Sequence, residues 1–305
     1  MQPNELSKGA TYPTYLLGHP ARNPAWNVVY QAYREDNVVA AYHAAIEMGT
    51  GANGSAIGFY RQLEAEAETR SHGAIRKPTS WLQVEARDSI DPSIDIPIQH
   101  VIESTAARFG FSERPNTMVS ILLSEVDTPW AIGRSGYFVD KIPYDKICLP
   151  ERALQSEDQF VSVLSHEYAH LIALHLAEGN APRWLNEAFA TLSEGYPTSQ
   201  VTQMFKLRYA PWRSDHDLEL AFGAPENDEH GHWERSQAYA QSAIIGRYLQ
   251  GLKGDKGFAD LLRAFANHSR WKDLAMKFTG QEPVDEALKE VFGFGKRELF
   301  ERSRP

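Results

Sequence analysis

The segment SHEYAHLIALHLAEGNAPRWLNEAFA, residues 165–190, decides the fold of the central part of this chain. Apolar residues surround its H-E-x-x-H motif at helical spacing, and upstream Ser156 is a good N-cap. The sequence therefore predicts a helix over 156–178, apolar around much of its circumference and hence buried. Pro182 suits the first turn of a following helix, which we expect over 182–194.

Two histidines of the motif lie one helical turn apart. His166 and His170 have i, i+4 spacing, which places both imidazole rings on one face of the predicted helix. Two imidazole nitrogens in this arrangement can bind one zinc ion. Burying both rings in an apolar helix without a partner would be costly, and a metal removes that cost. The alternative is a pair of core histidines hydrogen-bonded to their neighbours.

A catalytic zinc takes three protein ligands and leaves one position for water. Glu187 lies on the second predicted helix, which can turn its carboxylate back toward the histidines, and we assign it as the third ligand. Glu178, at the end of the first helix, and Glu194, near the end of the second, compete for this role. His175 is about 140° away from His170 around the helix, which favours a solvated or supporting role.

The motif and its surroundings resemble a known family. H-E-Y-A-H followed by W-L-N-E-A-F-A is similar to the gluzincin metallopeptidases, a group that includes thermolysin and aminopeptidase N, and most closely to their bacterial peptidase MA-like members. The resemblance extends to the strand 147–150 before the motif and to Y-A-Q-S at 239–242 after it, and covers about residues 80–295. The gap between His170 and Glu187 is a residue or two shorter than usual, and Ala188 replaces a common glycine.

The resemblance implies a role for each matching residue. Zinc, one ion per chain, would be held by His166, His170 and Glu187. Glu167 would be the general base that takes a proton from the zinc-activated water. Tyr239 would donate its hydroxyl to the developing oxyanion. The alternative for Tyr239 is a core tyrosine.

Further residues would support this site. Asn186 and Thr191 could orient the ligands. The strand around 136–138 could pair with an extended substrate backbone. A loop ahead of the Tyr239 helix carries His230 and His232, which either are solvated or assist at the edge of the site.

The rest of the chain predicts a mixed architecture. We expect a zincin-like α+β fold, in which a small mixed β-sheet lobe packs on a mainly helical lobe with zinc in the cleft between them. The expected division is an N-terminal arm and helical segment of unknown role at 1–79 and a peptidase domain at 80–305, comprising an α/β lobe at 80–178 and a helical lobe at 179–305. A linker is expected over 71–79. Strands are expected at 81–86, 117–123, 137–139 and 146–149, and other helices at 24–48, 56–69, 96–109, 198–208, 233–250, 255–267 and 283–292.

Composition excludes several classes of protein. The chain has 305 residues, 31 Lys and Arg against 40 Asp and Glu, and a formal net charge of -9. An acidic chain without a basic block is a poor binder of nucleic acid and of anionic membranes. No stretch approaches the roughly 18 apolar residues of a membrane span, and the N-terminus has no signal-peptide pattern, so we expect a cytoplasmic protein unless a leader was removed. The single Cys148 is expected to be buried and inert.

The expected function is hydrolysis of peptide bonds in a peptide or protein substrate by zinc-activated water. Aminopeptidase N relatives carry a G-x-M-E-N segment ahead of the zinc helix, and no such segment occurs between Trp130 and Gln159. The absence of this segment disfavours an aminopeptidase that binds the free N-terminus of its substrate. Two other hypotheses stay open: a non-catalytic binding module with a peptidase fold, which would not need Glu167, and a metallohydrolase that acts on non-peptide bonds.

Overall fold

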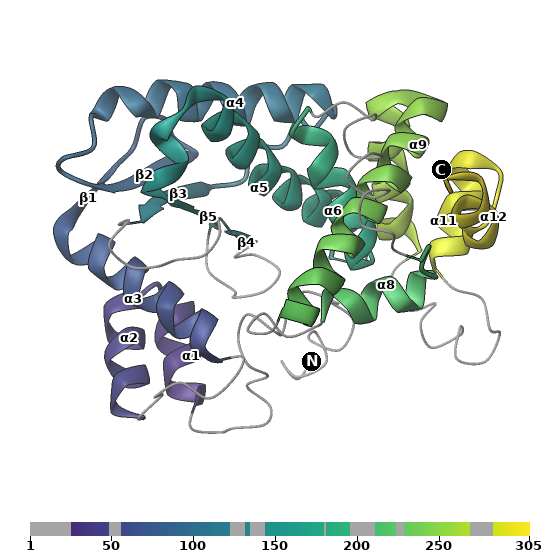
Figure 1. Cartoon of the computed structure of the whole chain (residues 1–305). Helices are drawn as coiled ribbons and strands as arrows, with labels where there is room; N and C mark the ends of the chain where they lie inside the picture. The colour runs from purple at the N-terminus through teal and green to yellow at the C-terminus, as the bar shows by residue number, and fades with distance from the viewer. Residues whose placement is uncertain are drawn as a thin grey trace. The chain divides into compact units, whose positions relative to one another are not determined.

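A computed structural model describes residues 26–48, 56–122, 132–134, 144–179, 181–195, 211–223, 229–268 and 283–305. The described chain is mostly helical with one small mixed sheet (Figure 1). It divides into two compact units. One, here called the sheet unit, contains the described residues up to 104 and 112–171. The other, the helical unit, contains 105–111 and the described residues from 172 onward.

The sheet has five strands in the order β1-β2-β3-β5-β4. Its strands are β1 (Gly73–Arg76), β2 (Leu82–Arg87), β3 (Thr117–Leu122), β4 (Ile132–Arg134) and β5 (Asp145–Pro150). The two outer pairs, β1–β2 and β4–β5, are antiparallel, and the central pairs are parallel. All residues of β3 and β5 are buried, as expected for parallel strands covered on both faces.

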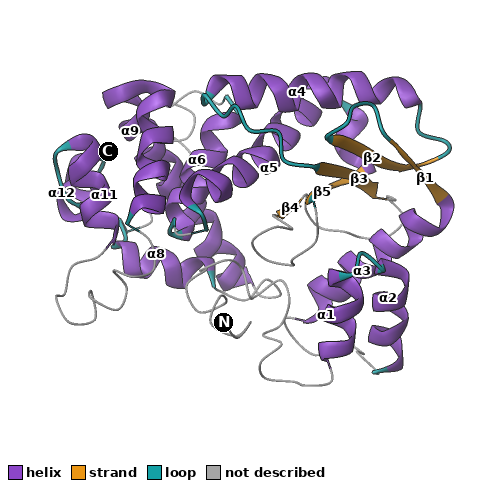
Figure 2. Ribbon diagram, turned by 180° about the vertical axis from the view of Figure 1, so that it is seen from behind, coloured by secondary structure: helices purple, strands orange, loops and turns teal. Residues whose placement is uncertain are grey.

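The helices of the sheet unit include α1 (Trp26–Arg34), α2 (Val38–Glu47), α3 (Ala56–His72) and most of α4 (Asp95–Arg108). α3 packs against the sheet, and α4 lies on the opposite side of it (Figure 2). The predicted helical stretch 24–48 is two helices, because Asp36 adopts a φ of 58° and the Asn37 side chain accepts from the Ala40 N–H to start α2.

The expected linker over 71–79 was wrong in part, because its residues 73–76 form edge strand β1. The chain passes directly from α3 into β1 at Gly73, where a Cβ would lie 2.6 Å from the carbonyl oxygens of Thr69 and Ala86. Only glycine fits this junction. The short strand β4 was not predicted either, since its three residues are too few for a pattern. The predicted strand 137–139 lies outside the described residues.

The helical unit is built from α6 (Arg183–Ser193), α8 (Asp215–Phe222), α9 (Glu229–Asn267), α11 (Pro283–Phe292) and α12 (Lys296–Arg302). The predicted helices 233–250 and 255–267 are confirmed as the two halves of α9, which breaks at Gly254 with a φ of 69°. α8 and α12 were not predicted, and 198–208 lies outside the described residues. α6 and α9 pack closely, since a Cβ on Gly246 would lie 2.8 Å from the Ala188 carbonyl oxygen.

A buried polar network joins the N-terminal helices to the sheet. Glu66 of α3 accepts hydrogen bonds from Lys146 Nζ of β5 at 2.6 Å, from the Tyr33 hydroxyl of α1 at 3.0 Å and from Gln62 Nε2 at 2.9 Å. Cys148 Sγ lies 3.6 Å from the same carboxylate and is fully buried, as predicted. The network makes α1 and α3 part of the sheet unit, while the expected domain boundary between 79 and 80 stays a prediction.

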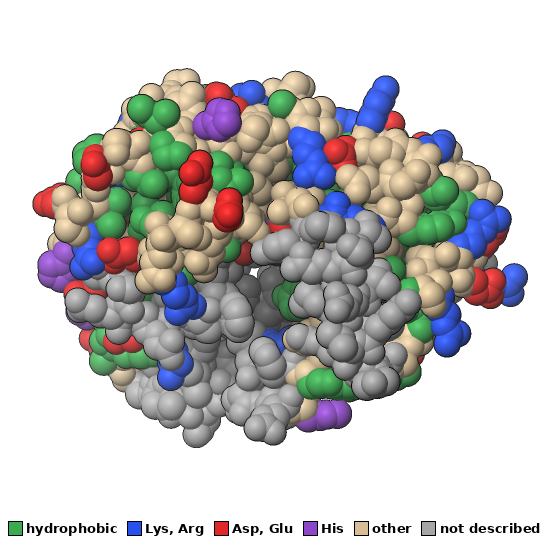
Figure 3. Space-filling view, turned by 45° about the horizontal axis from the view of Figure 1, so that its top comes forward, with side chains coloured by type: hydrophobic (Ala, Val, Ile, Leu, Met, Phe, Trp, Pro, Cys, Tyr) green, Lys and Arg blue, Asp and Glu red, His purple; other side chains and the backbone are tan. Residues whose placement is uncertain are grey.

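Among the helices of the described residues, none combines the length and the apolar character that crossing a membrane requires. On the face drawn in Figure 3, the acidic and basic side chains of the described residues are interspersed. The expectation that the chain binds neither nucleic acid nor membranes stays a prediction.

Candidate metal centre

The two predicted helices that carry the motif are confirmed. α5 (Glu157–Ala177) begins where the Ser156 hydroxyl accepts from the Gln159 N–H at 3.2 Å. It ends in a turn in which Glu178 and Gly179 both have positive φ values, and the Gly179 N–H donates to the Leu174 carbonyl. α6 then begins directly after Pro182. The division between the two units runs within α5, so this helix belongs to both.

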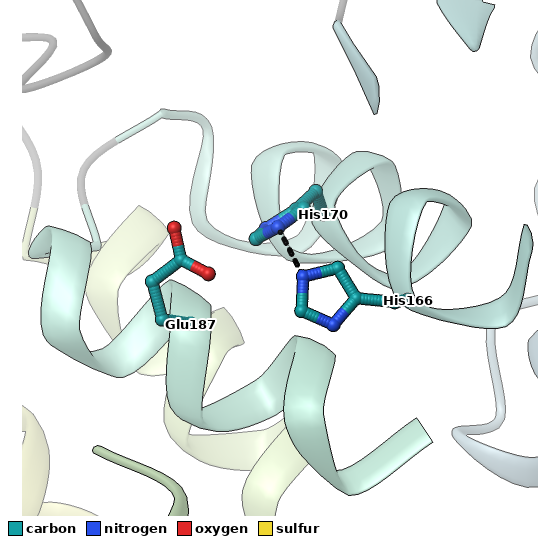
Figure 4. Close-up of side chains that lie close together, drawn as sticks. All are labelled: His166, His170 and Glu187. Carbon is teal, nitrogen blue, oxygen red and sulfur yellow. Dashed lines mark hydrogen bonds between the residues drawn. The ribbon is translucent and has the colours of Figure 1, made fainter. Parts of the chain in front are cut away.

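The two histidines of α5 converge on one point. His166 Nε2 and His170 Nε2 are 3.1 Å apart, and their rings are nearly perpendicular at 82° (Figure 4). Two nitrogens bound to one tetrahedral zinc at about 2.0–2.1 Å would be roughly 3.4 Å apart. The observed spacing is close to that value, so the ring nitrogens are placed as a metal would require.

Glu187 completes the cluster. It is buried on α6, the helix that follows α5, and its carboxylate faces the two rings (Figure 4). Potential ligand atoms of His166, His170 and Glu187 all lie within 4.8 Å of one another. Two imidazoles and one carboxylate are a donor set that suits zinc and other divalent transition metals.

The competing glutamates lie elsewhere in their helices. Glu178 occupies the turn after α5, and Glu194 is the residue that ends α6, where its charge acts on Arg247. In the described part of the chain, Glu187 is the candidate that groups with both histidines. The arrangement therefore brings together the three ligands that the sequence predicted, whereas occupancy by a metal stays a prediction.

A cation that was not predicted from the sequence lies near Glu187. Arg183 Nε lies 3.9 Å from Glu187 Oε1, one turn earlier on α6. The i, i+4 spacing of these two residues was a signal available in the sequence. The Thr191 hydroxyl donates to the main-chain carbonyl of Glu187 at 2.9 Å, and so contacts the helix backbone. Asn186 is buried beside Glu187 in the sequence, and its orienting role stays a prediction.

α6 is anchored at both ends by opposite charges. At its N-terminus, Glu219 of α8 accepts from the Trp184 N–H at 3.1 Å. At its C-terminus, Arg108 donates to the Leu192 carbonyl at 2.9 Å. Each charge interacts favourably with the helix dipole at its end. Each also forms a hydrogen bond with a main-chain group that has no partner within the helix. Neither residue was found from the sequence, because both are distant from α6 along the chain.

Tyr239 lies on α9 near the beginning of α6. It is two helical turns before Gly246, on the same face of α9, and Gly246 packs on Ala188 next to Glu187. Its ring packs edge-on against Phe222, at 5.1 Å between centroids. Phe222 in turn accepts from Arg183 through its carbonyl oxygen. The oxyanion role of the Tyr239 hydroxyl stays a prediction.

The other predicted site residues take different positions. Glu167 is buried on α5 between the two histidines in sequence. His175 packs against Phe111 at 5.8 Å between ring centroids. His230 is 81% exposed and stacks on Trp233. The side chain of His232 and the segment 136–138 lie outside the described part.

Comparisons of the chain with protein-family models, with curated proteins and with solved structures find no match. The function of the chain is therefore inferred from the residues of the site.

Proposed function

We propose that the chain is a zinc-dependent metallopeptidase that hydrolyses peptide bonds. The observation that carries the proposal is the convergence of His166 Nε2, His170 Nε2 and the Glu187 carboxylate from two consecutive helices. The donor set, the H-E-x-x-H spacing and the resemblance to gluzincins all support the same chemistry. Three protein ligands leave a coordination position for water, as catalytic zinc sites do.

Zinc bound there would polarise the peptide carbonyl and lower the pKa of water toward neutrality. The chain's own residues would carry out the proton transfer and stabilise the oxyanion. Glu167 accepts the proton of the attacking water and delivers it to the leaving amine. Its position within α5, adjacent to His166 and largely buried, supports this role. Proton transfer of this kind typically contributes about 10²- to 10⁴-fold to the rate.

Tyr239 donates a hydrogen bond to the oxyanion of the tetrahedral intermediate. Its place on the face of α9 that packs on α6 supports this assignment. Arg183 and Glu219 keep the glutamate-bearing helix in place. Stabilising an oxyanion with one fixed donor is worth roughly 10²- to 10³-fold in kcat.

A peptide-library digest tests the proposed function. Zinc-loaded wild-type protein should cleave a set of peptides at internal bonds, and Glu167→Gln should leave the same library intact. If the wild-type protein binds zinc and hydrolyses an ester or amide library but cleaves no peptide, the chain is a metallohydrolase of non-peptide bonds and not a peptidase. If the protein binds zinc but hydrolyses none of these libraries, the non-catalytic binding module is the remaining hypothesis.

A further inference from the structure

We propose that Arg183 is a positioning residue for Glu187, holding one oxygen of its carboxylate so that the carboxylate is presented to the metal in a single orientation. The inference rests on the metal-binding part of the proposed function. It assigns a role to a residue outside the ligand set and outside the motif that predicts the site.

The first support is the way in which Arg183 itself is fixed. Its Nη1 donates to the Phe222 carbonyl oxygen at 2.8 Å, and its guanidinium carbon lies 4.7 Å from the centre of the Phe222 ring. Its side chain is only 10% exposed. A planar guanidinium held by a hydrogen bond and by a ring face has little freedom to turn. Arg183 is therefore a fixed positive charge.

The second support is the distance to Glu187. Arg183 Nε and Glu187 Oε1 are 3.9 Å apart, which is an ion pair but longer than a hydrogen bond. The attraction favours one direction for the carboxylate without binding it through a short bond. A ligand carboxylate needs this combination, because it must be oriented and still able to coordinate a cation.

The third support is that the charge of Arg183 acts on a second carboxylate besides that of Glu187. Its charge also acts on Glu219 of α8, which accepts hydrogen bonds from the first main-chain N–H groups of α6. The same cation thus connects the ligand Glu187 to the group that fixes the start of its helix. The Arg183 side chain therefore contributes both to the orientation of the Glu187 carboxylate and to the orientation of α6.

The experiment measures metal binding by the full chain, stripped with a chelator and titrated with zinc against a competing indicator. Arg183→Gln should weaken zinc binding roughly 10- to 100-fold. Arg183→Lys keeps the charge but loses the planar fork, and should fall between Arg183→Gln and wild type. Arg297→Gln is the matched control, since Arg297 is 94% exposed and also has a glutamate at i, i+4. It should bind zinc as wild type does.

Cobalt substitution separates positioning from a purely structural role. The visible absorption of bound Co²⁺ reports the geometry of its ligands, so Arg183→Gln should shift the bands while Arg297→Gln should not. A variant with a lowered melting temperature but with wild-type zinc affinity and wild-type cobalt bands would overturn the inference.

Arg183→Lys decides the question if Arg183→Gln does not fold, and unchanged affinity and bands in Arg183→Lys would equally overturn it. If wild type binds neither metal, the proposed function fails together with this inference. If wild type binds both and the Arg183 variants match it, only this inference fails.

Discussion

Glu167 is the residue that distinguishes a catalytic site from a site that only binds a metal. Glu167→Gln is nearly isosteric, so we expect the fold and the zinc content to stay unchanged. Gln cannot accept the proton, and the loss of a general base should lower kcat by about 10²- to 10⁴-fold. Zinc analysis and a peptide hydrolysis assay on the same sample check both parts. Unchanged turnover would rule out Glu167 as the base.

Tyr239 is a second residue with two competing roles. If its hydroxyl binds only the developing oxyanion, Tyr239→Phe should lower kcat roughly 10²- to 10³-fold with little change in KM. If the hydroxyl serves packing against Phe222 and its neighbours, the melting temperature should fall and kcat should stay normal. Measuring both quantities on one preparation distinguishes the two roles, and the second result would remove Tyr239 from the site.

At the level of the helices, α6 depends on the capping carboxylate of Glu219. Burial raises the pKa of Glu219, against the opposing effect of hydrogen bonds from α6 and of the Arg183 charge. The folded protein therefore keeps this proton to a higher pH than the unfolded chain does. The free energy of unfolding should consequently fall as pH rises from the ordinary pKa of a glutamate through the raised pKa.

Two variants test this helix anchor. Glu219→Gln keeps a hydrogen-bond acceptor but cannot ionise, so it should flatten that part of the stability profile. Glu219→Ala removes the acceptor and should cost about 0.5–2 kcal/mol, as the loss of a helix cap does. Urea unfolding at several pH values gives both results. A Glu219→Gln profile that keeps the wild-type slope would show that another group titrates there.

The helices also show which parts of the fold can be predicted from the sequence. Apolar periodicity and a good N-cap were sufficient for α5, and the Pro182 start was sufficient for α6. Edge strand β1 was not predicted, because its pairing with β2 defines it rather than its own pattern. The short helix α8 was not predicted although Ser214 caps it, because its eight residues are too few for a clear apolar period. The grouping of His166, His170 and Glu187 was predictable because the three residues lie on two consecutive helices. Its support by Glu219 and Arg108 was not, since those contacts arise only when distant segments fold together.

Over the whole molecule, the buried Lys146–Glu66 pair connects the N-terminal helices with the sheet. Lys146 and Glu66 are both almost completely buried, and their charged atoms are 2.6 Å apart. Lys146→Met should lower the free energy of unfolding by about 3–5 kcal/mol, because it leaves Glu66 buried without its cation. The double variant Lys146→Met, Glu66→Gln should recover part of this loss. Chemical denaturation measures both, and a single variant as stable as wild type would contradict the importance of the pair.

Zinc content is the most direct test of the account, measured on wild type and on the double variant His166→Ala, His170→Ala. The convergence of the two ring nitrogens with Glu187 predicts one zinc per chain in wild type. The double variant should fold, because each change only shortens a side chain on α5, and should contain no zinc. A folded double variant that keeps one equivalent of zinc would contradict the assignment of the metal centre.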